Sequence, residues 1–172
     1  MAAELARRGW VIVSGLALGI DMAAHRGALE AGGRTLAVLG SGVQNVYPRR
    51  GVALAAQIAA SGAVLSEQPP GAGVSRQTLI ARNRITSGLC RAVIVVESQA
   101  DSGSANTARW AWKQGRAVFA VAGSVAGNEA LLEQGAEPVP AGGIDWDDLA
   151  ARLADVEIRP PVEGEPVQPR FF

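Results

Sequence analysis

Short apolar runs separated by glycine-containing turns recur along the chain, and most of them precede a segment with the periodicity of a helix. Continuous apolar runs of this kind are typical of strands buried on both faces of a parallel sheet. They predict strands at residues 10–14, 35–39, 63–66, 92–97, 117–121 and 136–139. The helical segments are predicted at residues 2–8, 20–31, 52–60, 105–114, 128–134 and 145–153, with a further helix around residues 82–84. Because strand and helix alternate, we expect an α/β fold, a Rossmann-like three-layer sandwich with a mostly parallel sheet.

Two aspartates stand where a side chain would cap the start of a helix. Asp21 lies at the beginning of the segment at residues 20–31, and Asp145 opens the one at residues 145–153. A side-chain oxygen at such a position accepts hydrogen bonds from backbone amides that lack a partner inside the helix. We expect residues 1–156 to form a single Rossmann-like domain. Residues 157–172, rich in proline and acidic side chains, are expected to form a disordered tail.

The formal net charge is zero, but the charges are divided unevenly along the chain. Residues 1–128 hold 13 basic and 6 acidic side chains, whereas residues 129–172 hold 3 basic and 10 acidic ones. A basic body suits a polyanionic ligand. Three roles are open for the acidic part: a solvated face, a partner surface or a shield for the basic part.

Composition argues against several classes of protein. No apolar run reaches the roughly 20 residues of a membrane-spanning helix, and residues 1–10 lack the apolar core of a signal peptide, so we expect a cytoplasmic protein with no membrane partner. Cys90 is the only cysteine, which excludes an intramolecular disulfide and a cysteine-based zinc site; we expect it to be a small buried residue at a helix end. His25 is the only histidine, and we expect it to have a structural role near the first strand-to-helix turn.

The turns that follow the predicted strands hold the candidate chemistry. In a parallel α/β sheet the ligand lies outside the carboxyl ends of the strands. The turns at residues 15–19, 40–42, 66–67, 97–104 and 122–123 should therefore meet at one rim. Glycines there let the backbone approach a ligand, and helix amides attract anions, which suits phosphate; alternatively, the glycines only form tight turns. Neither the dinucleotide-binding spacing nor a phosphate-loop motif is present, so a nicotinamide enzyme and a P-loop ATPase are not indicated.

Two groups of polar residues are candidates for holding phosphate. Arg82, Asn83 and Arg84 interrupt an otherwise apolar stretch, and two rigid, permanently charged guanidiniums this close make a good phosphate clamp. The alternative is a solvated helix face paired with carboxylates elsewhere. Small donors also gather at the start of a predicted helix, where they would suit a phosphate or a ribose; the alternative is a helix capped by serine. These donors are Ser102, Gly103, Ser104, Asn106 and Thr107.

Taken in order, the motifs resemble those of the DNA-processing protein A (DprA/Smf) family. The matching segments are VSGLALGID at 13–21, AHRGAL at 24–29, AVLGSG at 37–42, YP at 47–48, LSEQP at 65–69, RNRI at 82–85, VVE at 95–97, SGS at 102–104, TA at 107–108, GR at 115–116 and GA at 135–136. The resemblance covers residues 10–136. Ordered motifs over such a span are far more specific than any one of them.

The resemblance implies an extended Rossmann fold that binds single-stranded DNA in a basic pocket, forms a homodimer and helps to load the RecA recombinase on incoming DNA during natural transformation. It implies no catalysis, and we expect neither a cofactor nor a metal ion. The residues that it assigns to nucleic-acid binding are Arg82, Asn83, Arg84, Gly15, Gly19, Gly40, Ser41, Ser102, Gly103, Ser104 and Thr107.

The chain departs from the family pattern at several points. The family usually begins one strand and helix earlier, with a Gly-Ser-Arg phosphate-binding turn, so we expect an N-terminally truncated core with a lower affinity for DNA. Leu79 and Ile80 stand where an aromatic-proline pair is common, which argues against base stacking there. Ala122-Gly123 replaces the usual Pro-Gly, and the winged-helix domain of many members is not part of the sequence.

Two other functions fit the same fold class. One is a nucleoside monophosphate phosphoribohydrolase of the lysine-decarboxylase-like fold, whose P-G-G-x-G-T-x-x-E motif ends in a glutamate that has no counterpart after Thr107. The other is a non-catalytic nucleotide sensor. Salt-sensitive oligonucleotide binding would favour the DNA-binding function, product formation the enzyme, and thermal stabilisation by a mononucleotide without turnover the sensor.

Overall fold

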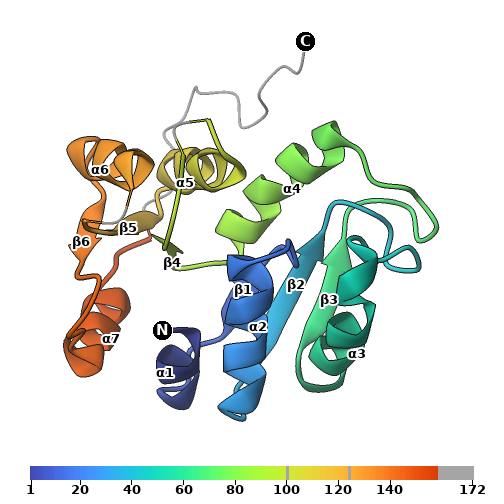
Figure 1. Cartoon of the computed structure of the whole chain (residues 1–172), viewed down its shortest axis with the longest axis horizontal. Helices are drawn as coiled ribbons and strands as arrows, with labels where there is room; N and C mark the ends of the chain where they lie inside the picture. The colour runs from blue at the N-terminus through green and yellow to red at the C-terminus, as the bar shows by residue number, and fades with distance from the viewer. Residues whose placement is uncertain (100, 124, 159–172) are drawn as a thin grey trace.

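The computed structural model describes residues 1–99, 101–123 and 125–158 (Figure 1). The strands are β1 (Ile12–Ser14), β2 (Thr35–Leu39), β3 (Ala63–Ser66), β4 (Ala92–Val95), β5 (Ala117–Val121) and β6 (Glu137–Val139). The helices are α1 (Ala2–Arg7), α2 (Ile20–Glu30), α3 (Val52–Ser61), α4 (Arg76–Gly88), α5 (Gly103–Lys113), α6 (Ala126–Glu133) and α7 (Trp146–Ala154), and the 3-10 turn η1 (Arg49–Gly51) precedes α3. Each predicted strand and helix is present. The predicted disordered tail lies outside the described residues from residue 159 onward.

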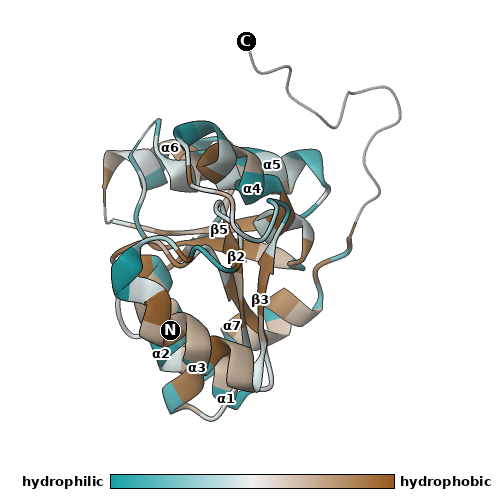
Figure 2. Ribbon diagram, turned by 90° about the vertical axis from the view of Figure 1, so that its right-hand side faces the viewer, coloured by the Kyte–Doolittle hydropathy of each residue, from teal (hydrophilic) through white to brown (hydrophobic). Residues whose placement is uncertain are grey.

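The strands form two parallel sheets, which confirms the predicted α/β class with parallel pairing. One sheet has the order β1-β2-β3 and the other has the order β4-β5-β6. Within the described ranges, β1 is not hydrogen-bonded to β4. Helices cover both faces of the strands: α1, α2, α3 and α7 lie on one side, and α4, α5 and α6 on the other (Figures 1 and 2).

Three groups of buried side chains hold the layers together. Leu39 of β2 packs with Leu54 and Ile58 of α3 in the first half of the molecule. Val118 of β5 packs with Ala108 of α5 and Leu131 of α6 in the second half. In Figure 2 the strands are coloured as hydrophobic and lie between the helices, as expected for strands buried on both faces.

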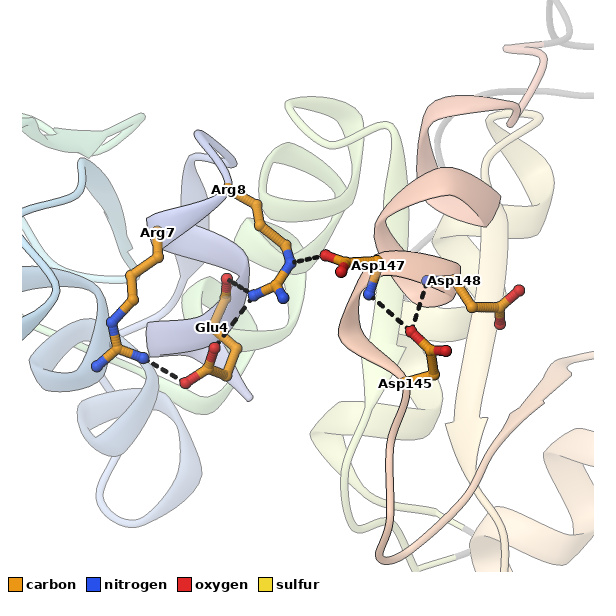
Figure 3. Close-up of polar contacts among 6 residues, drawn as sticks. All are labelled: Glu4, Arg7, Arg8, Asp145, Asp147 and Asp148. Carbon is orange, nitrogen blue, oxygen red and sulfur yellow. Dashed lines mark hydrogen bonds and ion pairs between the residues drawn. The ribbon is translucent and has the colours of Figure 1, made fainter.

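A third buried group and an ion pair connect the two halves. Leu5 of α1 packs with Phe119 of β5 and Leu149 of α7, so one core group spans both sheets. At the surface beside it, Nε of Arg8 donates to Oδ1 of Asp147 at 2.7 Å, as Figure 3 shows. On the opposite side, α4 packs along α5 (Figure 1). The two sheets therefore belong to one packed structure.

The two predicted aspartate caps have different outcomes. Asp145 caps α7 as predicted, because its Oδ1 accepts hydrogen bonds from the amides of Asp147 and Asp148, both at 3.0 Å (Figure 3). The prediction for Asp21 is wrong, because Gly19 occupies the N-cap position of α2 with a φ of 89°. The Asp21 carboxylate instead accepts from the amides of Gly15 at 3.0 Å and Ala17 at 3.2 Å. Asp21 therefore fixes the turn after β1.

The single cysteine lies at a helix end, as predicted, but is less buried than predicted, and the single histidine has the predicted structural role. Cys90 follows the end of α4, is half-buried and donates its thiol to the Thr86 carbonyl at 3.1 Å; burial raises its pKa to about 11. His25 is fully buried. The hydroxyl of Thr35 donates to the Ile12 carbonyl and accepts from Nδ1 of His25, both at 2.7 Å. Burial is the main cause that lowers the pKa of His25 to about 4, so its neutral ring links α2 to the sheet.

Candidate nucleic-acid interface

Helix α4 carries the predicted arginine clamp, and its start is fixed by a reciprocal pair of hydrogen bonds. The hydroxyl of Ser75 accepts from the Thr78 amide at 3.1 Å, and the Thr78 hydroxyl accepts from the Ser75 amide at 2.9 Å. This is a capping box with threonine at its third position. One turn further along, Leu79 packs against Gly40, where an added methyl group would come within 3.0 Å of the Leu79 Cα. The helix is thereby seated against the turn after β2.

Arg82 lies beneath the turn after β1. Its side chain is buried, and Nη1 donates to the carbonyl oxygen of Val38 in β2. A methyl group on Gly15 would overlap the guanidinium, so this position requires glycine if Arg82 keeps its place. In the described parts of the chain, no carboxylate lies within ion-pair distance of Arg82. Burial lowers its pKa, and the nearby Asp21 carboxylate partly opposes that change.

Asn83 connects α4 to the first turn of α5. Its side chain is buried, and Nδ2 donates to the Gly103 carbonyl at 3.3 Å and to Oδ1 of Asn106 at 3.1 Å. Ser102 caps α5 by accepting from the Ala105 amide at 3.2 Å. The serine cap that the sequence left open as the alternative is therefore present, and the other small polar residues of the group lie in the same turn.

Arg84 points away from Arg82, toward the turn after β3. It forms an ion pair with Glu67, and its side chain keeps 28% of its accessible surface. This pairing is the alternative that the sequence left open for a basic helix face. Because the pair is accessible to solvent, the carboxylate contributes little binding energy and phosphate can compete with it.

The predicted site residues fall into a buried set and an accessible set. The buried residues are Gly15, Gly40, Ser41, Arg82 and Asn83, and the exposed or half-buried residues are Gly19, Arg84, Ser102, Gly103, Ser104 and Thr107. The buried set shapes the turns. Ser41, for example, is fully buried, and its carbonyl accepts from the Ser66 hydroxyl at 2.7 Å. The accessible set presents the donors.

Two amide side chains that no sequence pattern singled out organise this region. Gln114 joins α4 to α5: its Nε2 donates to the Arg84 carbonyl at 2.8 Å, and its Oε1 accepts from the Ser87 hydroxyl at 2.7 Å. Asn128 in the first turn of α6 is fully buried and contacts the ends of β4 and β5. The available signal for Asn128 was a polar residue directly after Gly127, at the start of a short apolar helix.

Two other kinds of feature have no counterpart among the described residues. No three or more histidine, cysteine, aspartate or glutamate side chains among them are grouped so that they could hold a metal ion. The same residues contain no helix that is both long and apolar enough to span a bilayer.

Comparison with known proteins places this architecture in a family. The family model for DNA recombination-mediator protein A matches residues 1–152. DNA processing protein DprA of Bacillus subtilis is 43% identical over 154 residues, which are 87% of this chain and 52% of that protein. A putative DprA of Mycobacterium tuberculosis is 46% identical over 167 residues, which are 93% of this chain and 43% of that protein. The chain thus spans about half the length of these relatives.

Solved structures show the same fold. DNA processing protein A of Streptococcus pneumoniae superimposes with a TM-score of 0.75 at 41% identity, over 92% of this chain and 56% of that one. DNA processing protein A of Helicobacter pylori, a structure described for its single-stranded DNA binding mode, gives a TM-score of 0.79 at 30% identity over 89% of this chain and 70% of that one. The chain belongs to the DNA recombination-mediator protein A family, whose members include the proteins called DprA and Smf.

Proposed function

We propose that this chain binds the phosphate backbone of single-stranded DNA along the rim formed by α4, the turns after β1, β2 and β3, and the first turn of α5. Family membership and the DNA-binding mode of the Helicobacter pylori relative support this function. Of the predicted clamp, Arg84 then contacts the DNA strand, while Arg82 and Asn83 act from beneath the rim. Contacts of this kind hold a strand in place without reading its sequence.

The observation that carries the proposal is the buried charge of Arg82. A buried cation is costly unless an anion compensates it, and the described residues supply Arg82 with a carbonyl acceptor but with no ion-pair partner. The Asp21 carboxylate acts on Arg82 only from beyond ion-pair distance, and a phosphate at the rim would supply a further negative charge. The charge acts from beneath Gly15, because Arg82 itself is almost inaccessible.

The accessible residues make the direct contacts in this proposal. Arg84 exchanges its exposed ion pair with Glu67 for a phosphate. The first-turn amides of Gly103 and Ser104 lie at the positive end of α5 and attract the next phosphate. The Ser104 hydroxyl lies on the same turn of the helix, and the Thr107 hydroxyl, which donates to the Gly103 carbonyl at 2.9 Å, would have to turn to meet a phosphate. Gly19 lets the backbone after β1 approach the DNA strand closely.

We further propose the cellular role that the family resemblance implies. The chain contributes to loading of the RecA recombinase on single-stranded DNA during natural transformation, acts in the cytoplasm as a homodimer and catalyses no reaction. Because the chain spans about half the length of its relatives, we propose that it contributes to these activities and not that it carries them out alone.

The proposal is tested by fluorescence anisotropy of a labelled oligothymidylate at several salt concentrations. Arg84→Ala should weaken binding and lower the slope of log K against log salt by about 0.7, the value for one phosphate contact on a single strand. Arg82→Ala should also weaken binding, because the charge beneath the rim is lost.

Arg34→Ala is the matched control. Arg34 is exposed and directly precedes β2, at the opposite ends of the strands from the rim, so the substitution removes the same charge from a distant surface. Its oligothymidylate affinity should stay close to that of the parent. Equal losses in Arg34→Ala and Arg84→Ala would contradict a local site, and no binding by the parent at low salt would contradict the function.

A further inference from the structure

Asn128 occupies the point where β4 and β5 separate at their carboxyl ends. The last paired residues of these strands are Val95 and Ala120. One residue further along, Nδ2 of Asn128 donates to the carbonyl of Val96 at 3.0 Å and to that of Val121 at 2.9 Å, and it also lies 3.3 Å from the Val95 carbonyl. One side-chain amide thus joins two backbones at the position where their ladder stops.

This position requires a side chain that donates hydrogen bonds. Asn128 is fully buried, and three carbonyl oxygens surround its Nδ2, so a carboxylate of the same shape would be repelled by all three. An apolar side chain would leave buried carbonyls without this donor. Hydrogen bonding, and not side-chain volume, therefore explains the asparagine at this position.

The preceding residue holds the same segment by close packing. A methyl group on Gly127 would overlap the carbonyl of Ser98, and it would lie 2.9 Å from the carbonyl carbon of Gln99. The backbone after β4 therefore rests directly on the first turn of α6. Glu129, in the same turn, accepts from the Gly123 amide at 2.8 Å and so holds the segment after β5.

Hydrogen bonds connect the segment after β4 to the amino end of α5, where DNA is predicted to bind. Ser98 is buried, and its Oγ lies 2.8 Å from Oγ of Ser102. The Ser102 amide donates to the Gln99 carbonyl at 3.1 Å, and the Ser102 side chain caps α5. Asn83 of the arginine-bearing helix then donates to the carbonyl of Gly103. The segment that packs on the first turn of α6 is thus connected to the amino end of α5 through Ser98 and Ser102, and that end of α5 is connected to α4 through Asn83.

We infer that Asn128 is a positioning residue that fixes the segment after β4, and with it the amino end of α5, for phosphate binding. This inference rests on the proposed function for its consequence in binding, and on the hydrogen bonds of Asn128 for its structural part. Asn128 contacts no ligand itself; it holds the backbone at Val96, and Ser98 and Ser102 further along the same segment connect that backbone to the start of α5. With Asn128 in place, the rim is ordered before the DNA arrives.

The test compares Asn128→Ala with Gln134→Ala, which removes an exposed amide at the other end of α6. Neither substitution changes the charge. Asn128→Ala should weaken oligothymidylate binding roughly three- to tenfold, because the segment must then be ordered on binding. The slope of log K against log salt should not change, since no cation is lost. Gln134→Ala should bind as the parent does, and Asn128→Ser replaces Asn128→Ala if the alanine variant does not fold.

Two readouts separate positioning from a general loss of stability. Hydrogen exchange should rise in Asn128→Ala at the amides of residues 96–99 and 101–105 and stay at parent rates in α2 and β2. In a double-mutant cycle with Ser102→Ala, the two losses of affinity should be less than additive, because both act on the same helix end.

Unchanged affinity, additive losses, or exchange that rises equally in both halves of the molecule would overturn the inference. If the parent itself binds no oligothymidylate, the proposed function fails, and the exchange data alone decide whether Asn128 positions the segment.

Discussion

Replacing Gly15 by alanine tests whether Arg82 occupies the place that the structure gives it. Gly15 has an ordinary backbone conformation, so alanine is not excluded by its φ angle. The added methyl group would instead overlap the guanidinium of Arg82, which is held by the Val38 carbonyl. Either the turn after β1 shifts, or Arg82 leaves its buried position.

Both responses destabilise the folded state by similar amounts. Overpacking of a well-packed region costs about 1–3 kcal/mol. Expelling Arg82 loses a hydrogen bond from a charged donor, worth about 1.5–3 kcal/mol, and rehydration of the guanidinium offsets part of that loss. The lower backbone entropy of alanine in the unfolded chain returns about 0.4–1 kcal/mol. We therefore expect Gly15→Ala to lower the free energy of unfolding by about 1–2 kcal/mol, which for a chain of this length shifts Tm by on the order of 5 °C.

The assay is urea unfolding of the parent, Gly15→Ala, Arg82→Ala and the double variant. In the Arg82→Ala background the methyl group meets no guanidinium, so Gly15→Ala should have little effect or be slightly stabilising. The coupling energy between the two substitutions should be about 1 kcal/mol or more. An equal cost of Gly15→Ala in both backgrounds would show that Arg82 does not lie beneath this turn.

Three further predictions follow from other parts of the structure. Asp145→Ala should destabilise the protein by about 0.5–2 kcal/mol in urea unfolding, because α7 loses its cap, and Asp145→Asn should retain most of the stability. The pKa of His25 falls from its ordinary value of 6.5 to about 4 in the folded state, so the unfolded chain binds a proton first as the pH decreases. Stability from this group is complete above pH 6.5 and should fall by about 3 kcal/mol by pH 4; His25→Gln should remove that part of the pH dependence, and an unchanged profile would argue against the buried neutral ring. Incubation with adenosine monophosphate should release no ribose 5-phosphate, because the glutamate of the phosphoribohydrolase motif has no counterpart after Thr107; release would favour the enzyme.

Most of the secondary structure could be predicted because strands buried on both faces give uninterrupted apolar runs. The predicted bounds of β2, β3 and β5 agree with the structure at both ends. The start of α4 was not predicted, since its capping box uses Thr78 at the third position in place of the usual glutamate or glutamine. Asp21 was misassigned because an acidic residue in the first turn looks the same in sequence whether it caps the helix or the turn before it.

The candidate site was harder to predict than the fold. The sequence predicted that the turns after the strands meet at one rim and that the arginine cluster forms a phosphate clamp, but it could not show that Arg82 is buried under Gly15 while Arg84 pairs with Glu67. These contacts join segments that are far apart in the chain, and no local pattern encodes them. The role of Asn128 was missed for the same reason, because its three acceptors lie on β4, β5 and the segment between β4 and α5.

The most direct test of the proposed function is a map of amide chemical shifts in the ¹⁵N-labelled chain during titration with an oligothymidylate. The proposal predicts that the largest changes in amide chemical shift occur in residues 15–19, 40–42 and 102–107 and at Arg84, with little change in α7. Shifts confined to α7 and the neighbouring acidic residues, or no shifts at a saturating oligonucleotide concentration, would contradict binding at the rim.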